Sequence, residues 1–251
     1  MKKNIGNKRL YGVRRMRDGK KFHQKSSKDK ILKAVNNFEE VCNSGKFKFK
    51  YLDDWLFTKS IIFKNETTLT NQKNFKVYPR GTIVYAKLGV NIGSEFSGNH
   101  FCVVLNKNDN KRNELITIVP LTSKDTKFSL KLQENLILKA LEKMKTDHKT
   151  LRFDLDRIKE MHARSTKVKN LNPAIEKELD EIENNYMQLA KIIERYERFV
   201  GKQTYAIPSQ VITISKKRIS TLNDYDPTGH ISFNEETLKI IEDFMKANIL
   251  S

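Results

Sequence analysis

The chain has 251 residues, 38% of them hydrophobic, and its 48 lysine and arginine residues against 30 acidic residues give a formal net charge of +18. No segment approaches the roughly 18 consecutive apolar residues of a membrane-spanning helix, and the basic N-terminus lacks the apolar segment of a signal peptide. Cys42 and Cys102 have no partners at metal-binding spacing and do not make a disulfide scaffold. The sequence therefore predicts a cytoplasmic protein without a membrane segment, and its charge favours a nucleic-acid partner.

The positive charge is concentrated near the N-terminus. Residues 1–50 contain 16 lysines and arginines against 4 acidic residues, a net charge of +12. Residues 1–26 have few apolar side chains and no periodicity, which predicts a flexible basic arm. Such an arm either contacts RNA or DNA or keeps the chain soluble, and the sequence leaves both roles open.

Residues 27–76 are predicted to form an N-terminal helical region. Ser27 can cap a helix over 28–42, in which apolar residues recur at helical spacing. A second helix is predicted over 47–62, with Trp55 as a packing residue, and the polar residues 63–76 are expected to be a linker.

Strand patterns begin after Pro79. We predict strands over 82–86, 100–106, 114–121 and 128–132, and a glycine-rich loop over 89–98 that can adopt positive φ or lie close to a ligand. Cys102 is expected to be buried. Two more short strands are predicted over 205–208 and 210–214, followed by an amphipathic helix over 233–250.

The segment 134–200 between these strands has a different period. Apolar residues and two histidines step alternately by four and three on both sides of a turn at 170–173, which predicts an antiparallel hairpin with a coiled-coil seam. Pro173 is expected at the first helical position of the second arm. The predicted seam comprises Ile137, Leu141, Met144, His148, Leu151, Leu155, Ile158 and His162, then Ile175, Leu179, Ile182, Tyr186, Leu189, Ile193 and Tyr196.

Strands before and after a long hairpin indicate one α+β domain with an inserted hairpin. The predicted organisation is a basic arm (1–26), a helical region (27–76), a small β-barrel (77–133 plus 201–251) and the inserted hairpin (134–200).

Four motifs resemble the MazF/PemK family of toxin endoribonucleases. They are Arg80-Gly81-Thr82-Ile83-Val84, Leu88 with Gly93-Ser94-Glu95 and Gly98, Val119-Pro120-Leu121-Thr122-Ser123, and Gln210-Val211-Ile212-Thr213 followed by Lys217-Arg218-Ile219. The resemblance covers 79–124 and 203–250, and it is nearest to longer PemK-like members with an N-terminal helical region. It implies an SH3-like barrel, a homodimer, a cognate antitoxin and metal-independent, sequence-specific cleavage of single-stranded RNA.

In many members of this family, an arginine after the glycine loop and the threonine of the Pro-Leu-Thr motif carry catalysis. Thr122 matches the threonine, whereas the arginine position holds His100. Histidine is suited to either proton-transfer role in RNA cleavage, because its ordinary pKa is near 6.5. Glu95 is the second candidate, as a base or as the partner that orients His100. Each of these residues can also be purely structural.

Further side chains are candidates for binding RNA. Ser94 and Thr122 can donate to a phosphate oxygen, and Arg80 or Arg218 can supply the positive charge missing at position 100. Ser123 and Gln210 belong to the matching motifs. No metal or other cofactor is expected, since His148 and His162 have no carboxylate or cysteine at a ligand spacing.

Two other functions stay open. The same barrel can be a non-catalytic module that binds nucleic acid or protein, as in the related CcdB-like family that poisons DNA gyrase, because fold alone does not fix function. A third interpretation is a scaffold in which the hairpin binds a partner.

Overall fold

The structure is a computed structural model that describes residues 27–68, 74–165 and 173–250. The chain divides into two compact units, residues 1–44 and 45–251. The predicted basic arm, 1–26, lies outside the described residues.

The first unit contains one described helix, α1 (Lys28–Cys42), at the predicted boundaries. The Ser27 hydroxyl caps it by accepting a hydrogen bond from the backbone N–H of Lys30 at 3.3 Å. None of its residues is buried, and four of its apolar residues are 43–54% exposed, namely Ile31, Leu32, Val35 and Phe38.

The second unit is built on six antiparallel strands, all close to the predicted positions. They are β1 (Ile83–Gly89), β2 (Gly98–Val104), β3 (Leu115–Thr122), β4 (Leu130–Lys131), β5 (Tyr205–Ala206) and β6 (Ile212–Ser215). The order is β1-β2-β3-β5-β4, with β6 also paired to β3. The unit therefore has the predicted α+β class, but the sheet is not closed within the described residues, so a closed barrel is not confirmed.

Alternation along the strands divides the core between the two faces of the sheet. Ile83 and Val103 belong to one buried cluster, whereas their neighbours Val84 and Cys102 belong to another. Successive side chains of a strand point to opposite faces, so one apolar run supplies both clusters. The thiol of Cys102 is fully buried, which raises its pKa.

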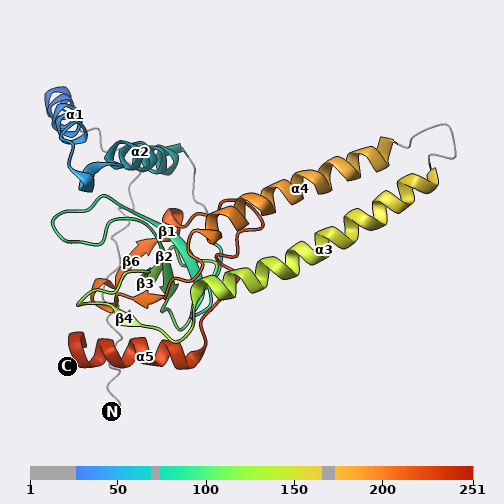
Figure 1. The fold of residues 1–251 in the computed structure, drawn as a ribbon. Helices are drawn as coiled ribbons and strands as arrows, with labels where there is room; N and C mark the ends of the chain where they lie inside the picture. Colours follow the sequence, from blue (N-terminus) through green and yellow to red (C-terminus); the bar gives the residue numbers. More distant parts are fainter. Residues whose placement is uncertain (1–26, 69–73, 166–172, 251) are drawn as a thin grey trace, which may run out of the picture. The chain divides into compact units, whose positions relative to one another are not determined.

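The predicted hairpin is present as α3 (Leu136–Ser165) and α4 (Pro173–Glu197), which lie side by side in Figure 1. Pro173 is the first residue of α4, as predicted. His148 and Tyr186, both predicted seam residues, meet across the hairpin with ring centroids 5.4 Å apart. The seam side chains of Leu151, Leu155, Ile158, His162, Ile175 and Leu179 lie outside the described residues, so the coiled-coil seam stays a prediction.

The base of the hairpin is part of the core. Met144 of α3 and Leu189, Ile192 and Tyr196 of α4 are buried in the same cluster as Ile83. The hairpin is consequently not a free-standing insertion, because the first turns of α3 and the last turns of α4 complete the apolar face of the sheet.

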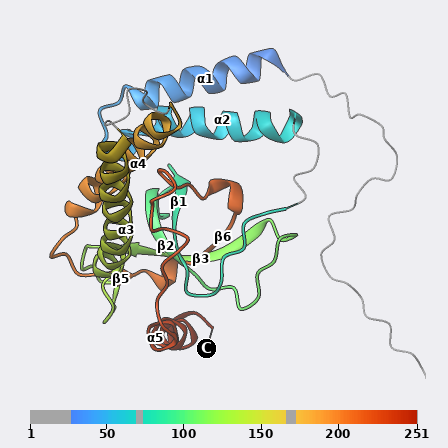
Figure 2. The ribbon, with the colours of Figure 1, turned by 90° about the vertical axis from the view of Figure 1, so that its right-hand side faces the viewer.

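The helices α2 (Leu52–Thr68) and α5 (Glu235–Met245) lie at opposite ends of the sheet in both ribbon views (Figures 1 and 2). The helix predicted over 47–62 is wrong at its start, because Phe47–Phe49 forms a 3-10 turn and α2 begins at Leu52. The predicted linker 63–76 is wrong in its first residues, because α2 continues to Thr68. α5 is followed by a π-helical turn, Lys246–Leu250. Among the described residues, no helix combines the length and the apolar character needed to cross a membrane.

Trp55 fixes α2 against the sheet at a glycine. The indole ring lies over Gly89, where an added Cβ atom would come within 2.0 Å of Trp55 Cε2, and the Arg218 guanidinium lies 5.3 Å from the indole centroid. Gly89 also has φ +79°. Only glycine combines this backbone conformation with such a close approach.

Gly89→Ala is therefore expected to destabilise the protein more than a glycine substitution of equal backbone strain. Gly93→Ala is the matched control, since Gly93 has φ +58° and nothing within 4 Å of an added Cβ. Both variants cost about 1–2 kcal/mol for the left-handed backbone, and Gly89→Ala adds about 1–3 kcal/mol for overpacking against Trp55. Urea unfolding measures the stability of both variants. Equal losses of unfolding free energy would contradict this role of Trp55.

Candidate active site

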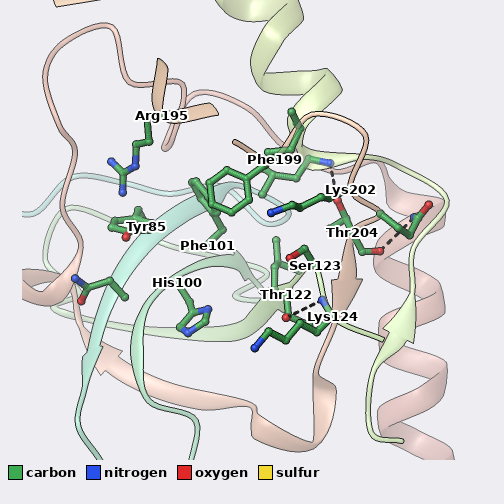
Figure 3. Close-up of a pocket in the computed structure, with 15 residues that line it drawn as sticks. Tyr85, His100, Phe101, Thr122, Ser123, Lys124, Arg195, Phe199, Lys202 and Thr204 are labelled. Atoms are coloured by element: carbon green, nitrogen blue, oxygen red, sulfur yellow. Dashed lines mark hydrogen bonds between the residues drawn. The ribbon is translucent and has the colours of Figure 1, made fainter. Parts of the chain in front are cut away.

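A cavity of about 240 Å³ opens where β1, β2 and the end of β3 meet the last turn of α4. It combines apolar, hydroxyl and cationic groups. The residues labelled in Figure 3 are Tyr85, His100, Phe101, Thr122, Ser123, Lys124, Arg195, Phe199, Lys202 and Thr204. The structure thus brings together three sequence-predicted residues, namely His100, Thr122 and Ser123.

Two groups of side chains are distinguished in Figure 3. The ring of Phe101 lies on the side of Phe199 and Arg195, whereas the ring of His100 lies on the side of Thr122 and Lys124. The separation follows from the strand, because His100 and Phe101 are consecutive in β2 and point to opposite faces. We name the first set the aromatic group (Tyr85, Phe101, Arg195, Phe199) and the second the histidine group (His100, Thr122, Lys124).

The ring of His100 is held from several sides. Its Nε2 lies 3.0 Å from the Ser97 carbonyl, the backbone of Leu121 also hydrogen-bonds the ring, and the ring of Phe96 packs at 4.3 Å between centroids. Burial lowers the pKa of His100 below 6.5, and the charge of Lys124 lowers it further, although the two backbone hydrogen bonds oppose the change. His100 is consequently neutral at neutral pH. Because Nε2 faces a carbonyl oxygen it carries the hydrogen of the neutral ring, which leaves the lone pair on Nδ1.

The hydroxyl of Thr122 is oriented by the turn that follows β3. Its Oγ1 accepts a hydrogen bond from the backbone N–H of Lys124 at 3.1 Å. That bond uses the oxygen as acceptor, so the hydroxyl hydrogen is left to donate to a ligand. Ser123 and Lys124 are exposed beside it. The end of β3 therefore offers hydroxyl donors and a cation together, an arrangement suited to a phosphate group.

Glu95 lies in a second cavity, together with Phe96, Ser209 and Gln210. Gln210 Oε1 accepts from the backbone N–H of Phe96 at 3.3 Å and thereby holds the glycine loop. Among the described residues, the ring of His100 is oriented by Ser97, Leu121 and Phe96, and no contact joins it to Glu95. Ser94 is an exposed residue of the same loop. As predicted, this loop adopts positive φ at Gly89, Gly93 and Gly98.

The two arginines expected to supply charge lie elsewhere. Arg80 donates to the Leu105 carbonyl and pairs with Glu242 of α5 at 2.6 Å. Arg218 donates to the carbonyls of Lys87 and Leu88, and burial lowers its pKa. Neither lines the cavity, because each is engaged in joining distant parts of the chain.

The cavity is instead lined by Arg195, Lys124 and Lys202, none of which belongs to a motif in the sequence. Lys124 directly follows the Leu-Thr-Ser motif, and its proximity to that motif was the one available signal. Arg195 lies in the helical hairpin, whose heptad pattern gives no sign that its base reaches the sheet. Within the described residues, no cluster of three or more histidine, cysteine or acidic side chains is arranged to hold a metal ion.

Comparison with known proteins identifies a family for part of the chain. Residues 79–190 match the PemK-like, MazF-like toxin of type II toxin–antitoxin systems. The match begins just before β1 and runs through α3 into α4, so it includes most of the hairpin and stops before β5, β6 and α5. No curated protein matches the chain. The motifs at β1, the glycine loop, the end of β3 and the histidine group all lie inside the matched range. The region 79–190 of this chain belongs to the family of PemK-like, MazF-like toxins of type II toxin–antitoxin systems.

Proposed function

We propose that this protein is an endoribonuclease toxin that cuts single-stranded RNA at short sequences, with the histidine group as its active site. The family is one of toxin–antitoxin systems and is generally endoribonucleolytic. The observation that carries the proposal is the meeting of His100, Thr122 and Lys124 at one cavity from separate parts of the chain. A neutral base, a hydroxyl donor and a cation are the groups that RNA cleavage without a metal requires.

In this mechanism His100 removes the proton from a ribose 2′-hydroxyl, whose oxygen attacks the adjacent phosphorus. The bond from phosphorus to the 5′ oxygen breaks, which leaves a 2′,3′-cyclic phosphate and a 5′-hydroxyl. Thr122 and Ser123 donate hydrogen bonds to the phosphate oxygens, and Lys124 offsets the charge that develops there. The leaving oxygen takes its proton from Lys124 or from water.

The remaining sequence-predicted residues have other roles in this proposal. Glu95 and Gln210 line the second cavity beside the glycine loop, to which Ser94 belongs, and all three contact the RNA strand as it continues past the histidine group. Arg80 and Arg218 act indirectly, because they fix α5 and the end of β1.

We further propose the family's assembly for this chain. The six strands would then be a partly open SH3-like barrel, the protein a cytoplasmic homodimer, and a cognate antitoxin its inhibitor. The seam of α3 and α4 would be a short coiled coil. The exposed basic residues at the cavity suit an acidic antitoxin segment as well as RNA.

The test of the cleavage proposal is the chemistry of the product ends. The protein is incubated in EDTA with a long unstructured RNA, and the 3′ ends are analysed. We expect discrete cuts that carry 2′,3′-cyclic phosphates. Thr122→Val should lower the rate roughly 10²-fold, as loss of one donor to a developing charge does. Thr117→Val is the matched control, because that hydroxyl bonds Thr213 on the sheet, at 2.9 Å.

A second candidate is a binding module that holds RNA without cutting it. Two observations favour it: position 100 is histidine, and both Ser97 and the backbone of Leu121 hydrogen-bond its ring. If those bonds hold the ring rigidly, His100 is a structural residue. Tight RNA binding with no cleaved product would select this function.

A further inference from the structure

The guanidinium of Arg195 is available to a ligand in a way that those of the half-buried Arg80 and Arg218 are not. Its Cζ lies 4.1 Å from the centroid of the Tyr85 ring, and its Nη1 lies 3.8 Å from Asp226 Oδ2. Arginine carries five N–H donors, and none of those of Arg195 makes a hydrogen bond to another described residue. Arg80 and Arg218, by contrast, each donate to backbone carbonyls.

The contact with Asp226 holds Arg195 in place but leaves the N–H groups of its guanidinium available to a ligand. Asp226 is buried and accepts from Thr228 N–H at 3.0 Å, Thr228 Oγ1 at 2.8 Å and Leu222 N–H at 3.0 Å. The hydroxyl of Tyr196 adds a further bond at 3.3 Å. The carboxylate is therefore satisfied without Arg195, and its charge acts on the guanidinium at longer range than a direct ion-pair hydrogen bond of about 2.8 Å.

Arg195 also stands beside aromatic surface. The rings of Tyr85 and Phe101 meet edge to face with centroids 5.1 Å apart, and Phe199 lies 6.1 Å from Phe101. Figure 3 shows these rings on the side of the cavity away from His100. Proteins commonly bind single-stranded nucleic acid with a cation that contacts the phosphate and an aromatic ring on which a base stacks.

We propose that the aromatic group is a nucleotide-binding subsite in which Arg195 binds a phosphodiester of the RNA next to the one that is cut. This inference rests on the proposed function for the identity of the ligand. Asp226 is a positioning residue, because it orients Arg195 and does not touch the RNA. The hairpin thereby contributes to substrate binding, since Arg195 lies in the last turn of α4.

The test is the salt dependence of RNA binding, measured with a labelled 2′-O-methyl RNA that has no nucleophile and stays intact. Arg195→Met should weaken binding about 10-fold and reduce the slope of log K against log salt by about 0.7, the value of one phosphate contact on a single strand. Arg195→Lys should keep the slope and lose part of the affinity, because it retains the charge without the planar guanidinium.

Arg198→Met is the matched control, since Arg198 is an exposed residue three positions farther along and does not line the cavity. It should change affinity less than 2-fold. Adding Asp226→Asn to Arg195→Met should cause no further loss of RNA affinity, because Asp226 acts only through Arg195. Equal effects of Arg195→Met and Arg198→Met, or absence of RNA binding by the parent protein, would overturn the inference. Binding with the predicted slopes but without cleavage of ordinary RNA would leave Arg195 in its role and refute the nuclease.

Discussion

Replacing His100 by alanine is expected to reduce the rate of RNA cleavage by roughly 10²–10⁴-fold, the usual contribution of a general base. The expected result follows from the neutral imidazole at the cavity, which is the proton acceptor in our mechanism. RNA affinity should change little, because the binding charge comes from Lys124, Arg195 and Lys202. Single-turnover cleavage at saturating protein separates the two effects.

The dependence of the rate on pH gives an independent signature of His100. A base acts only when it is unprotonated, and burial lowers the pKa of His100 below 6.5. The rate should therefore be constant around neutral pH and fall only as the pH decreases below 6.5 through the lowered pKa. The residual activity of His100→Ala should lack this decrease. A cleavage rate that already falls with decreasing pH above pH 6.5, or a fall below pH 6.5 that persists in His100→Ala, would contradict His100 as the base.

Asp109→Asn is expected to cost roughly 3–5 kcal/mol of unfolding free energy, the largest stability effect that we predict. Lys216 Nζ lies 2.8 and 2.7 Å from the two carboxylate oxygens of Asp109, and the two side chains are only 3% and 1% exposed. Asp109 also accepts from Tyr78 N–H at 2.8 Å. The variant leaves the Lys216 ammonium buried beside a neutral amide, which cannot replace the charge.

Lys217→Met is the matched control for this buried pair. Lys217 adjoins Lys216 and pairs with Glu66 at 3.1 Å, but both side chains are more exposed, at 28% and 44%. A surface pair of this kind contributes about 0–1 kcal/mol. Urea unfolding should therefore show a much larger loss for Asp109→Asn than for Lys217→Met. Similar losses would show that the Lys216–Asp109 pair does not stabilise the sheet.

The pair also predicts how stability responds to acid. Burial opposes ionisation of Asp109, but the hydrogen bonds from Lys216 and Tyr78 outweigh it and hold the pKa below 3.8. A carboxyl group whose pKa is depressed by folding stabilises the protein above its unfolded pKa, and this contribution is lost as the pH falls through the folded pKa. The difference in unfolding free energy between the parent and Asp109→Asn should thus have its full size at neutral pH and shrink below about pH 4.

Local patterns in the sequence predict the secondary structure well. Ser27 and Pro173 begin helices where capping chemistry places them, and alternation in β1 and β2 separates the two core clusters. Each of these signals acts within a few residues. The end of α2 is an exception, because polar residues as far as Thr68 continue a helix that the polar composition alone suggested was a linker.

Pairing between distant residues is what the sequence did not reveal. Asp109 looks like an ordinary turn residue until the fold brings Lys216 to it. Arg80 and Arg218 look like free charges until Glu242 and the carbonyls of β1 are seen to engage them. Arg195 reaches the cavity only because the base of the hairpin is packed into the core. Heptad spacing within α4 does not predict that packing.

The most direct measurement is cleavage of one long unstructured RNA in EDTA by the parent protein and by His100→Ala, with the 5′ ends of all products mapped. We expect discrete cuts at a shared short sequence with the parent protein, and with the variant only the residual cleavage left by a roughly 10²–10⁴-fold loss of rate, while both retain RNA binding. The same cuts at equal rates from both proteins, or bound but intact RNA with the parent, would contradict the assignment of the histidine group as a ribonuclease active site.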